Sequence, residues 1–375
     1  MIETVSGSPE LLKTLVFLLG SCALAFAWAP LLTHFLYRFN VVKGVKVELT
    51  NVGEHSGKGA TPVMGGLLVI VTVSFVTFFF NWTQSFTYFP IGVMLFGAML
   101  GALDDLLNVY GAKRRIRSIR HTLTLIRVHQ NLSARIWLIV TLPWALFKRF
   151  ALFFGSHTGR GVYVHEKLLL QFVAGAMAAW WIYFKLGVAW HYISIPFFGN
   201  IELGWLIIPF IILVVMFTAN AVNIADGMDG LAGGMLITTF GALTFLSSIS
   251  GFQELALLNA TTVGALIAYT YFNIKPARFI MGDVGSLGLG TLLAINALAI
   301  GENFTLIFLG FMFYVEAVTV IIQIAGKHIL KRRIFLMAPI HHHFELSGWS
   351  EEKTIMRFWL IHLIFVILGV WITLQ

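Results

Sequence analysis

Ten apolar segments, each about long enough to cross a lipid bilayer, follow one another along this chain of 375 residues. Hydrophobic residues make up 58% of the sequence and charged residues only 11%, so a water-soluble fold could not cover the apolar surface. We therefore predict an all-α polytopic integral membrane protein, in which a bundle of about ten transmembrane helices forms a single domain over residues 1–375. The expected spans are residues 14–37, 63–81, 90–103, 168–187, 203–220, 231–249, 255–272, 285–300, 304–325 and 355–374.

The positions of Lys and Arg predict which ends of these helices face the cytoplasm. If the N-terminus lies outside, 23 of the 25 basic residues fall in inner segments, and only Lys13 and Lys185 lie outside. The positive-inside rule then places both termini on the periplasmic side and every aspartate on the cytoplasmic side. The inner segments are 38–62, 104–167, 221–230, 273–284 and 326–357.

Residues 133–155 are apolar enough to suggest an eleventh span, but a proline and the pair Lys148 and Arg149 interrupt them. An extra span would also place the aspartate motifs on opposite faces of the membrane and remove the charge bias. We therefore predict that the basic and apolar region 111–160 is cytoplasmic and lies at the membrane interface. Its basic run, 113–120, is open to two interpretations: contact with anionic lipid headgroups, or a solvated loop.

All five aspartates of the chain lie where an apolar run ends: Asp104, Asp105, Asp226, Asp229 and Asp283. A carboxylate at the edge of a lipid-buried helix is costly, which favours a functional role. The adjacent pair Asp104 and Asp105 would repel each other unless a cation or a proton-transfer role balances them, although a solvated helix end is the alternative. Asp283, among small residues at a helix start, is typical of a hard-cation site such as one for Mg²⁺.

Two further motifs on the same side carry polar side chains and glycines. Residues 220–234 (NAVNIADGMDGLAGG) offer amides and carboxylates that can recognise a sugar or a base edge, and this loop lacks Lys and Arg although it lies on the basic side. Residues 58–66 (KGATPVMGG) offer a lysine for a phosphate and glycines that let the backbone approach a ligand. Ordinary helix packing explains the glycines of this second motif at least as well.

Three consecutive histidines, His341, His342 and His343, stand close to Glu345. Neighbouring side chains on a chain cannot all point one way, which argues against a zinc site made by this run alone. Near a diphosphate, histidines can donate hydrogen bonds and change their charge close to neutral pH.

Together, these cytoplasmic motifs offer carboxylates for Mg²⁺, cations for phosphate and amides for a polar head group, all mounted on a membrane bundle. The combination predicts transfer of a phosphorylated group from a soluble donor to a lipid acceptor. A transporter is the alternative from another class, but transporters place polar sites near the bilayer midplane and often have repeated halves, neither of which is visible here.

The succession TPVMGG, DD, NAVNIADGMDGLAGG, GDVGSL and MAPIHHHFE closely resembles the phospho-N-acetylmuramoyl-pentapeptide transferase family, within the polyprenyl-phosphate N-acetylhexosamine-1-phosphate transferases. The similarity runs from about Lys58 to Trp359, and the last motif favours this branch over relatives that use UDP-N-acetylglucosamine. The resemblance implies an enzyme of the bacterial inner membrane that converts UDP-N-acetylmuramoyl-pentapeptide and undecaprenyl phosphate to lipid I and UMP. It also implies a Mg²⁺ cofactor and an active site at the cytoplasmic membrane face.

The same resemblance assigns site residues, motif by motif. It implies that Asp283 is the main metal ligand, that Asp104 and Asp105 are acceptor-side carboxylates, and that His341 completes the catalytic set. The residues that it assigns to the nucleotide and diphosphate are Lys58, Asn223, Asp226, Gly227, Asp229, Asn273, His341 and His342.

The chain departs from the family pattern at several positions. Ile280 stands where the family usually has a phenylalanine that packs on uracil, so either the neighbouring Phe279 takes over or the stacking is weaker. Leu336 replaces a usual basic residue, Asn108 a frequent lysine, and region 111–160 is longer than usual. Membrane lipid, a second copy of the chain and other cell-wall synthesis enzymes are the candidate partners, and no nucleic acid is expected.

Overall fold

The computed structural model describes residues 9–42, 61–83, 86–112, 119–154, 161–187, 190–196 and 198–375. Lys58, one of the expected nucleotide-pocket residues, lies outside these ranges. Within them the chain is almost entirely helical, and the only sheet is one antiparallel pair of strands, β1 (Tyr192–Ile195) and β2 (Gly199–Glu202).

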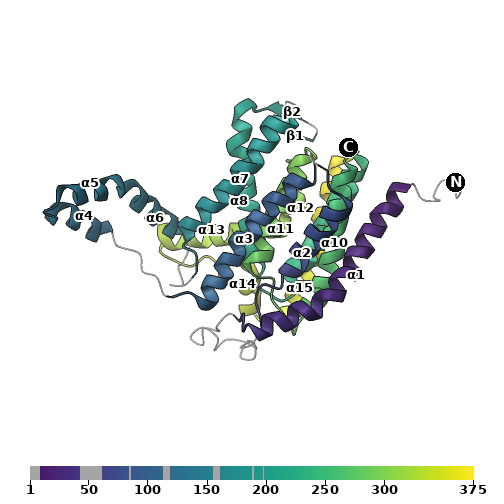
Figure 1. Cartoon of the computed structure of the whole chain (residues 1–375), viewed down its shortest axis with the longest axis horizontal. Coiled ribbons are helices and arrows are strands. Elements are labelled where there is room, and N and C mark those ends of the chain that lie inside the picture. The colour runs from purple at the N-terminus through teal and green to yellow at the C-terminus, as the bar shows by residue number, and fades with distance from the viewer. Residues whose placement is uncertain are drawn as a thin grey trace.

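Nine helices in the described part of the chain are long and apolar enough to cross a membrane (Figure 1). A tenth apolar helix, α2 (Leu67–Phe80), is shorter. Each coincides with one of the ten expected spans, which confirms the all-α polytopic fold. The nine are α1 (Pro9–Arg38), α3 (Tyr88–Tyr110), α7 with its π-helical end (Val164–Leu186), α8 with a preceding 3₁₀ turn (Gly204–Ala225), α9 (Leu231–Ile249), α10 (Gln253–Asn273), α11 (Gly282–Ala299), α13 with its π-helical end (Phe311–Leu330) and α15 (Glu351–Thr373).

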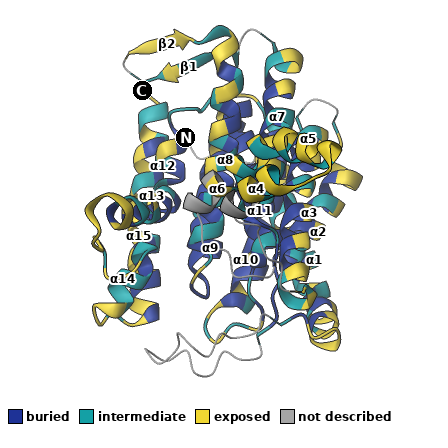
Figure 2. Ribbon diagram, turned by 90° about the vertical axis from the view of Figure 1, so that its left-hand side faces the viewer, coloured by how far each residue is buried: buried dark blue, intermediate teal, exposed yellow. Residues whose placement is uncertain are grey.

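Helices α10 and α11 form the centre of the bundle, as the burial colours in Figure 2 show. In α11, 89% of the most apolar window is buried inside the protein, compared with 22% in α1 and 28% in α15. Helix α11 packs against α3 and α8, while α10 packs against α1 and α9. A helix without a lipid-facing side is free to carry polar residues, so the start of α11 can hold a functional group.

Glycines allow α2 to cross α11 with its backbone in contact. A Cβ atom added to Gly66 would lie 2.3 Å from Cα of Gly285. The N–H groups of Gly65 and Gly66 also donate to the carbonyl groups of Ile280 and Met281, at 2.8 and 2.9 Å. Close approach through small residues is the usual way in which membrane helices pack. Packing therefore accounts for these two glycines of the 58–66 motif.

Helix α3 runs to Tyr110, so the expectation that Asp104 and Asp105 end this helix is wrong. The apolar run does stop there, but Leu106, Leu107 and Asn108 continue the same helix. Loss of hydropathy marks where a helix leaves the lipid, and a helix can continue past that point. The two carboxylates consequently project from a regular helix with fixed directions.

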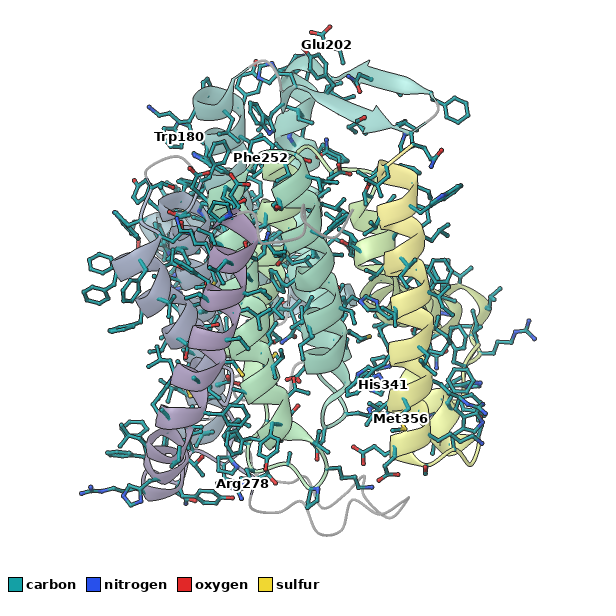
Figure 3. All side chains as sticks on the ribbon, turned by 90° about the vertical axis from the view of Figure 1, so that its right-hand side faces the viewer. Trp180, Glu202, Phe252, Arg278, His341 and Met356 are labelled. Carbon is teal, nitrogen blue, oxygen red and sulfur yellow. The ribbon has the colours of Figure 1, made fainter. Side chains whose placement is uncertain are left out.

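The loops at the two ends of the bundle are distinct. Figure 3 places Arg278, His341 and Met356 at one end, and Glu202, Trp180 and Phe252 at the other. The first group belongs to the segments that carry the aspartate and histidine motifs. We call this end the site end; that it faces the cytoplasm stays a prediction from the positions of the basic residues.

The described residues of region 133–155 form two short helices, α5 (Leu132–Val140) and α6 (Leu142–Phe154), neither of which reaches spanning length. Helices α5 and α4 (Ile119–Val128) stand away from the bundle on the left of Figure 1, whereas α6 lies beside it. No described helix in this region is long enough to span by itself, and that the region lies at the membrane interface stays a prediction. Two more short helices complete the described chain, α12 (Leu306–Leu309) and α14 (Ile340–Leu346).

Candidate active site

Three charged side chains from three different helices meet at the site end. Nζ of Lys167, in the first turns of α7, lies 2.6 Å from Oδ2 of Asp283 on α11 and 3.4 Å from Oδ2 of Asp104 on α3. All three side chains are largely buried, and that of Lys167 is 17% exposed. Two of the aspartates selected from the sequence are thus brought together, although they are far apart in the chain. Lys167 was not selected, because no motif distinguishes it from the other basic residues on the inner side.

The second oxygen of Asp283 also has a fixed partner. The amide of Asn223, near the end of α8, donates 2.8 Å hydrogen bonds to Oδ1 of Asp283 and to the hydroxyl of Ser286. Asp283 lies in the first turn of α11, where the helix dipole favours a negative charge. The resemblance assigned Asn223 to the nucleotide pocket, whereas its contact in this structure is with the carboxylate expected to bind metal.

Asp104 is held by the chain that enters α7. The N–H of Val162 donates to Oδ1 of Asp104 at 2.7 Å, and the amide of Asn108 donates to the same oxygen at 3.2 Å. Gly161 has a φ of +81°, and a Cβ atom there would lie 2.7 Å from this oxygen, so only glycine fits at that position. Asn108, one turn further along α3, therefore supplies a neutral donor where the family frequently has a lysine.

Asp105 points elsewhere, because adjacent residues on a helix differ in direction by about 100°. Its Oδ2 accepts a 3.1 Å hydrogen bond from the N–H of Val284, in the first turn of α11. Gly282, with a φ of +73°, would bring a Cβ atom within 2.6 Å of this oxygen. Asp105 thus satisfies a free N–H at the start of α11 and holds that helix end against α3.

The 226–230 loop is a sequence of turns, so Asp226 and Asp229 do not share a helical face. Asp226 ends α8, and the backbone N–H of the buried Asp229 donates to a carboxylate oxygen of Glu351 at 3.4 Å. Lys275 forms ion pairs with Glu351 at 3.4 Å and with Glu352 at 2.9 Å. The start of α15 thereby joins the 226–230 loop to the loop after α10.

Asn273 acts as a second connection in the same place. Its Oδ1 accepts from the N–H of Gly230 at 2.8 Å, and its Nδ2 donates to the carbonyl of Phe279 at 2.9 Å. The ring of Phe279 is fully buried, with the rings of Tyr269 and Phe272 each 5.9 Å away. A ring in that position belongs to the core, which argues against Phe279 stacking on a nucleobase and favours the alternative of weaker stacking.

His341 and Glu316 form a completely buried pair. Nδ1 of His341 lies 3.0 Å from Oε2 of Glu316, and because a carboxylate only accepts, Nδ1 carries the proton. Nε2 of His341 has no hydrogen-bond partner among the residues that the structure describes. A Cβ atom on Gly227 would lie 2.5 Å from this nitrogen, so glycine is required there. Glu316 was not selected from the sequence, although a lone carboxylate inside an apolar run is a recognised signal of function.

The other two histidines of α14 have different partners, as expected for three in a row. Nδ1 of His342 lies 3.0 Å from Oε2 of Glu345, and Nδ1 of His343 accepts from the N–H of Leu336 at 3.2 Å. Burial and the neighbouring His341 lower the pKa of His342. The three rings therefore do not converge on one point, which agrees with the argument against a shared zinc ion.

The described part of the chain contains no cluster of three or more His, Cys, Asp or Glu side chains that could hold a metal. Asp104 and Asp283 nevertheless direct one carboxylate oxygen each at a single positive charge, the ammonium of Lys167. Mg²⁺ needs only one or two carboxylates, since water and phosphate oxygens complete its coordination. These two carboxylates are the residues that could hold Mg²⁺.

Comparisons with known proteins identify the family of this chain. Residues 160–301 match the model of glycosyl transferase family 4, a stretch that includes Lys167, Asn223 and Asp283. The phospho-N-acetylmuramoyl-pentapeptide-transferase of Levilactobacillus brevis is 30% identical over 97% of this chain and 99% of its own length. The enzyme of Chloroflexus aggregans is 33% identical over 90% of this chain and 83% of its own length. The enzyme of Methylacidiphilum infernorum is 31% identical over 88% of this chain and 83% of its own length. The chain therefore belongs to the phospho-N-acetylmuramoyl-pentapeptide-transferase family, a family of multi-pass bacterial membrane enzymes.

Proposed function

We propose that this protein transfers phospho-N-acetylmuramoyl-pentapeptide from UDP-N-acetylmuramoyl-pentapeptide to undecaprenyl phosphate, giving lipid I and UMP. The observation that carries the proposal is the meeting of Asp104, Lys167 and Asp283 at one end of a membrane bundle. Transfer between a nucleotide sugar and a lipid phosphate needs a charged site beside the membrane surface, within reach of both substrates. The relatives are named phospho-N-acetylmuramoyl-pentapeptide-transferases, which supports the same reaction.

We further propose Mg²⁺ as the cofactor, with Asp283 and Asp104 as its protein ligands. When bound, it would neutralise the charge on the diphosphate. The ammonium of Lys167 occupies the position between the two carboxylates in this structure. Lys167 would then contribute a second positive charge beside the phosphate groups.

We propose direct attack by the lipid phosphate on the β-phosphorus of the donor. A phosphate monoester has its second pKa at about 6, so at neutral pH it is already mostly dianionic and needs no strong base. The rival mechanism, a covalent phosphoryl intermediate on Asp104 or Asp105, requires a free carboxylate oxygen as nucleophile. Both oxygens of Asp104 are held by donors, and one oxygen of Asp105 accepts from the N–H of Val284. Such contacts stabilise the carboxylate anion and weaken it as a nucleophile.

A nucleotide pocket would lie beside this cluster, on the 226–230 loop. Two contacts support this proposal: Gly227 packs against Nε2 of His341, which has no hydrogen-bond partner among the described residues, and Asn273 accepts from the N–H of Gly230. Asp229 lies in the same loop. The remaining residues that we propose for this pocket are Lys58, Asn223, Asp226 and His342.

The test is UMP release by purified protein in lipid, supplied with undecaprenyl phosphate and Mg²⁺. Release with UDP-N-acetylmuramoyl-pentapeptide and not with UDP-N-acetylglucosamine, lost in Asp283→Ala, is the expected result. Release only with UDP-N-acetylglucosamine would assign the chain to the sister branch. A phosphorylated enzyme trapped with donor alone would support the covalent mechanism, whereas a single inversion at a chiral β-phosphorus would exclude it.

A further inference from the structure

Helices α4, α5 and α6 form an arm that leaves the bundle between α3 and α7. Because α3 ends and α7 begins at the site end, the arm starts at that end of the bundle. Helix α6 packs on α7, where the rings of Trp144 and His165 are 5.4 Å apart. Figure 1 shows α4 and α5 further out, standing away from the bundle. The arm is therefore fixed at its base and projects sideways.

The outer part of the arm is too apolar to face water. Helix α5 has no buried residue. The side chains of Ile136, Trp137 and Val140 are 53%, 68% and 65% exposed. Apolar side chains gathered on one exposed helix are unfavourable in water, so we expect another surface to cover them. A lipid surface and a second protein are the two candidates.

The charge of the arm decides between them. Residues 111–160 contain ten Lys and Arg residues and no Asp or Glu. On the described helices, Arg127, Arg135 and Lys148 accompany the apolar side chains, and Nζ of Lys148 lies 5.6 Å above the ring of Trp144. Apolar helices with basic and tryptophan side chains are typical of the membrane interface, where long cationic side chains reach the headgroups. The complementary surface is anionic lipid.

We propose that this arm lies on the anionic surface of the membrane that holds the bundle. Its apolar side chains enter the boundary of the acyl region, and Arg127, Arg135 and Lys148 contact lipid phosphates. The inference concerns a surface outside the Asp104, Lys167 and Asp283 cluster and does not depend on the proposed reaction.

The test uses the fact that the chain has one cysteine, Cys22. A fluorophore is attached to Ile136→Cys in a Cys22→Ser background, and the protein is placed in lipid nanodiscs of phosphatidylcholine with or without phosphatidylglycerol. Quenching by acrylamide, which is neutral and stays in water, reports how far the label is covered. A label at Phe198→Cys in the β1–β2 hairpin, at the opposite end, is the control for general effects of the lipid.

Quenching at 136 is expected to fall when phosphatidylglycerol is added, while quenching at 198 does not change. Each cation near an anionic surface raises the equilibrium constant for docking of the arm about five-fold. Replacing Arg127, Arg135 and Lys148 by Gln should therefore lower this constant by about 100-fold. The same change at Lys327, Arg332 and Arg333, all exposed at the site end, should leave quenching at 136 unaltered.

Equal quenching in the two lipids would overturn the proposal, and so would protection that survives the loss of the three charges. Protection that appears in detergent and grows with protein concentration would also overturn it, because the cover would then be a second copy of the chain.

Discussion

Replacing Lys167 by methionine removes the charge at the centre of the site and keeps much of its volume. The change leaves the carboxylates of Asp104 and Asp283 facing each other without the cation that now lies 3.4 and 2.6 Å from them. Both carboxylates keep other donors, Val162 and Asn223, so the local fold should survive. What is lost is the neutralisation of two like charges.

The size of the effect follows from burial. Removing one partner of a buried ion pair costs about 3–5 kcal/mol, because the remaining charge stays desolvated. The side chains of Asp104 and Asp283 are 10% and 18% exposed, so water screens them slightly, and we expect about 3 kcal/mol of lost stability. Turnover should fall further, by about 10²–10³-fold, the usual loss when a fixed positive or donor group at the reacting centre is removed.

The assay is thermal unfolding in detergent without substrates, with and without Mg²⁺, followed by UMP release in lipid. Lys167→Met should unfold at a lower temperature, and Mg²⁺ should raise its midpoint more than that of the parent, since the divalent ion replaces the missing charge. Lys167→Arg, which keeps the charge, is the control for stability. If Lys167→Met keeps the midpoint of the parent and responds equally to Mg²⁺, the interpretation of this cluster as a cation site is refuted.

Two further substitutions test how the site is positioned. Gly101→Ala places a Cβ atom 2.0 Å from the carbonyl oxygen of Asp283, so it should push α11 away from α3. We expect it to lower the free energy of unfolding by about 1–3 kcal/mol and to abolish activity. Gly92→Ala on the same helix is the control: its Cβ atom would have nothing within 4 Å, so thermal unfolding and turnover should not change. Glu316→Gln removes the charge behind His341 and should lower kcat about ten-fold or more, with little change in folding. Turnover measures the first effect and near-UV circular dichroism the second. An unchanged kcat would show that the pair has a structural role only.

The sequence predicted the bundle well because hydropathy reports directly on contact with lipid. All ten runs became helices, and the charge bias identified one end for every aspartate motif. Motif reasoning also selected Asp104, Asp283 and His341, which the structure places at that end with specific partners. Hydropathy could not locate the end of α3, since a helix continues after it leaves the apolar layer.

Residues without a local pattern escaped prediction. Lys167 lies in an ordinary helix start and becomes distinctive only because α3 and α11 bring two carboxylates to it. Glu316 did carry a signal, as the one acidic residue within the apolar run 304–325. Its partner, His341, is 25 positions further along the chain, so the pairing could come only from the fold.

The adjacent pair Asp104 and Asp105 shows how the fold separates two residues that the sequence treats alike. Repulsion between neighbouring carboxylates suggested one shared cation, but the helix turns the two side chains in different directions. Asp104 faces the ammonium of Lys167, on the side where we propose that Mg²⁺ binds. Asp105 accepts from the N–H of Val284, one residue after Asp283, and so fixes the helix end that carries the second carboxylate. A motif of two identical residues therefore supplies both a charge for the site and a support that keeps the opposing charge in place.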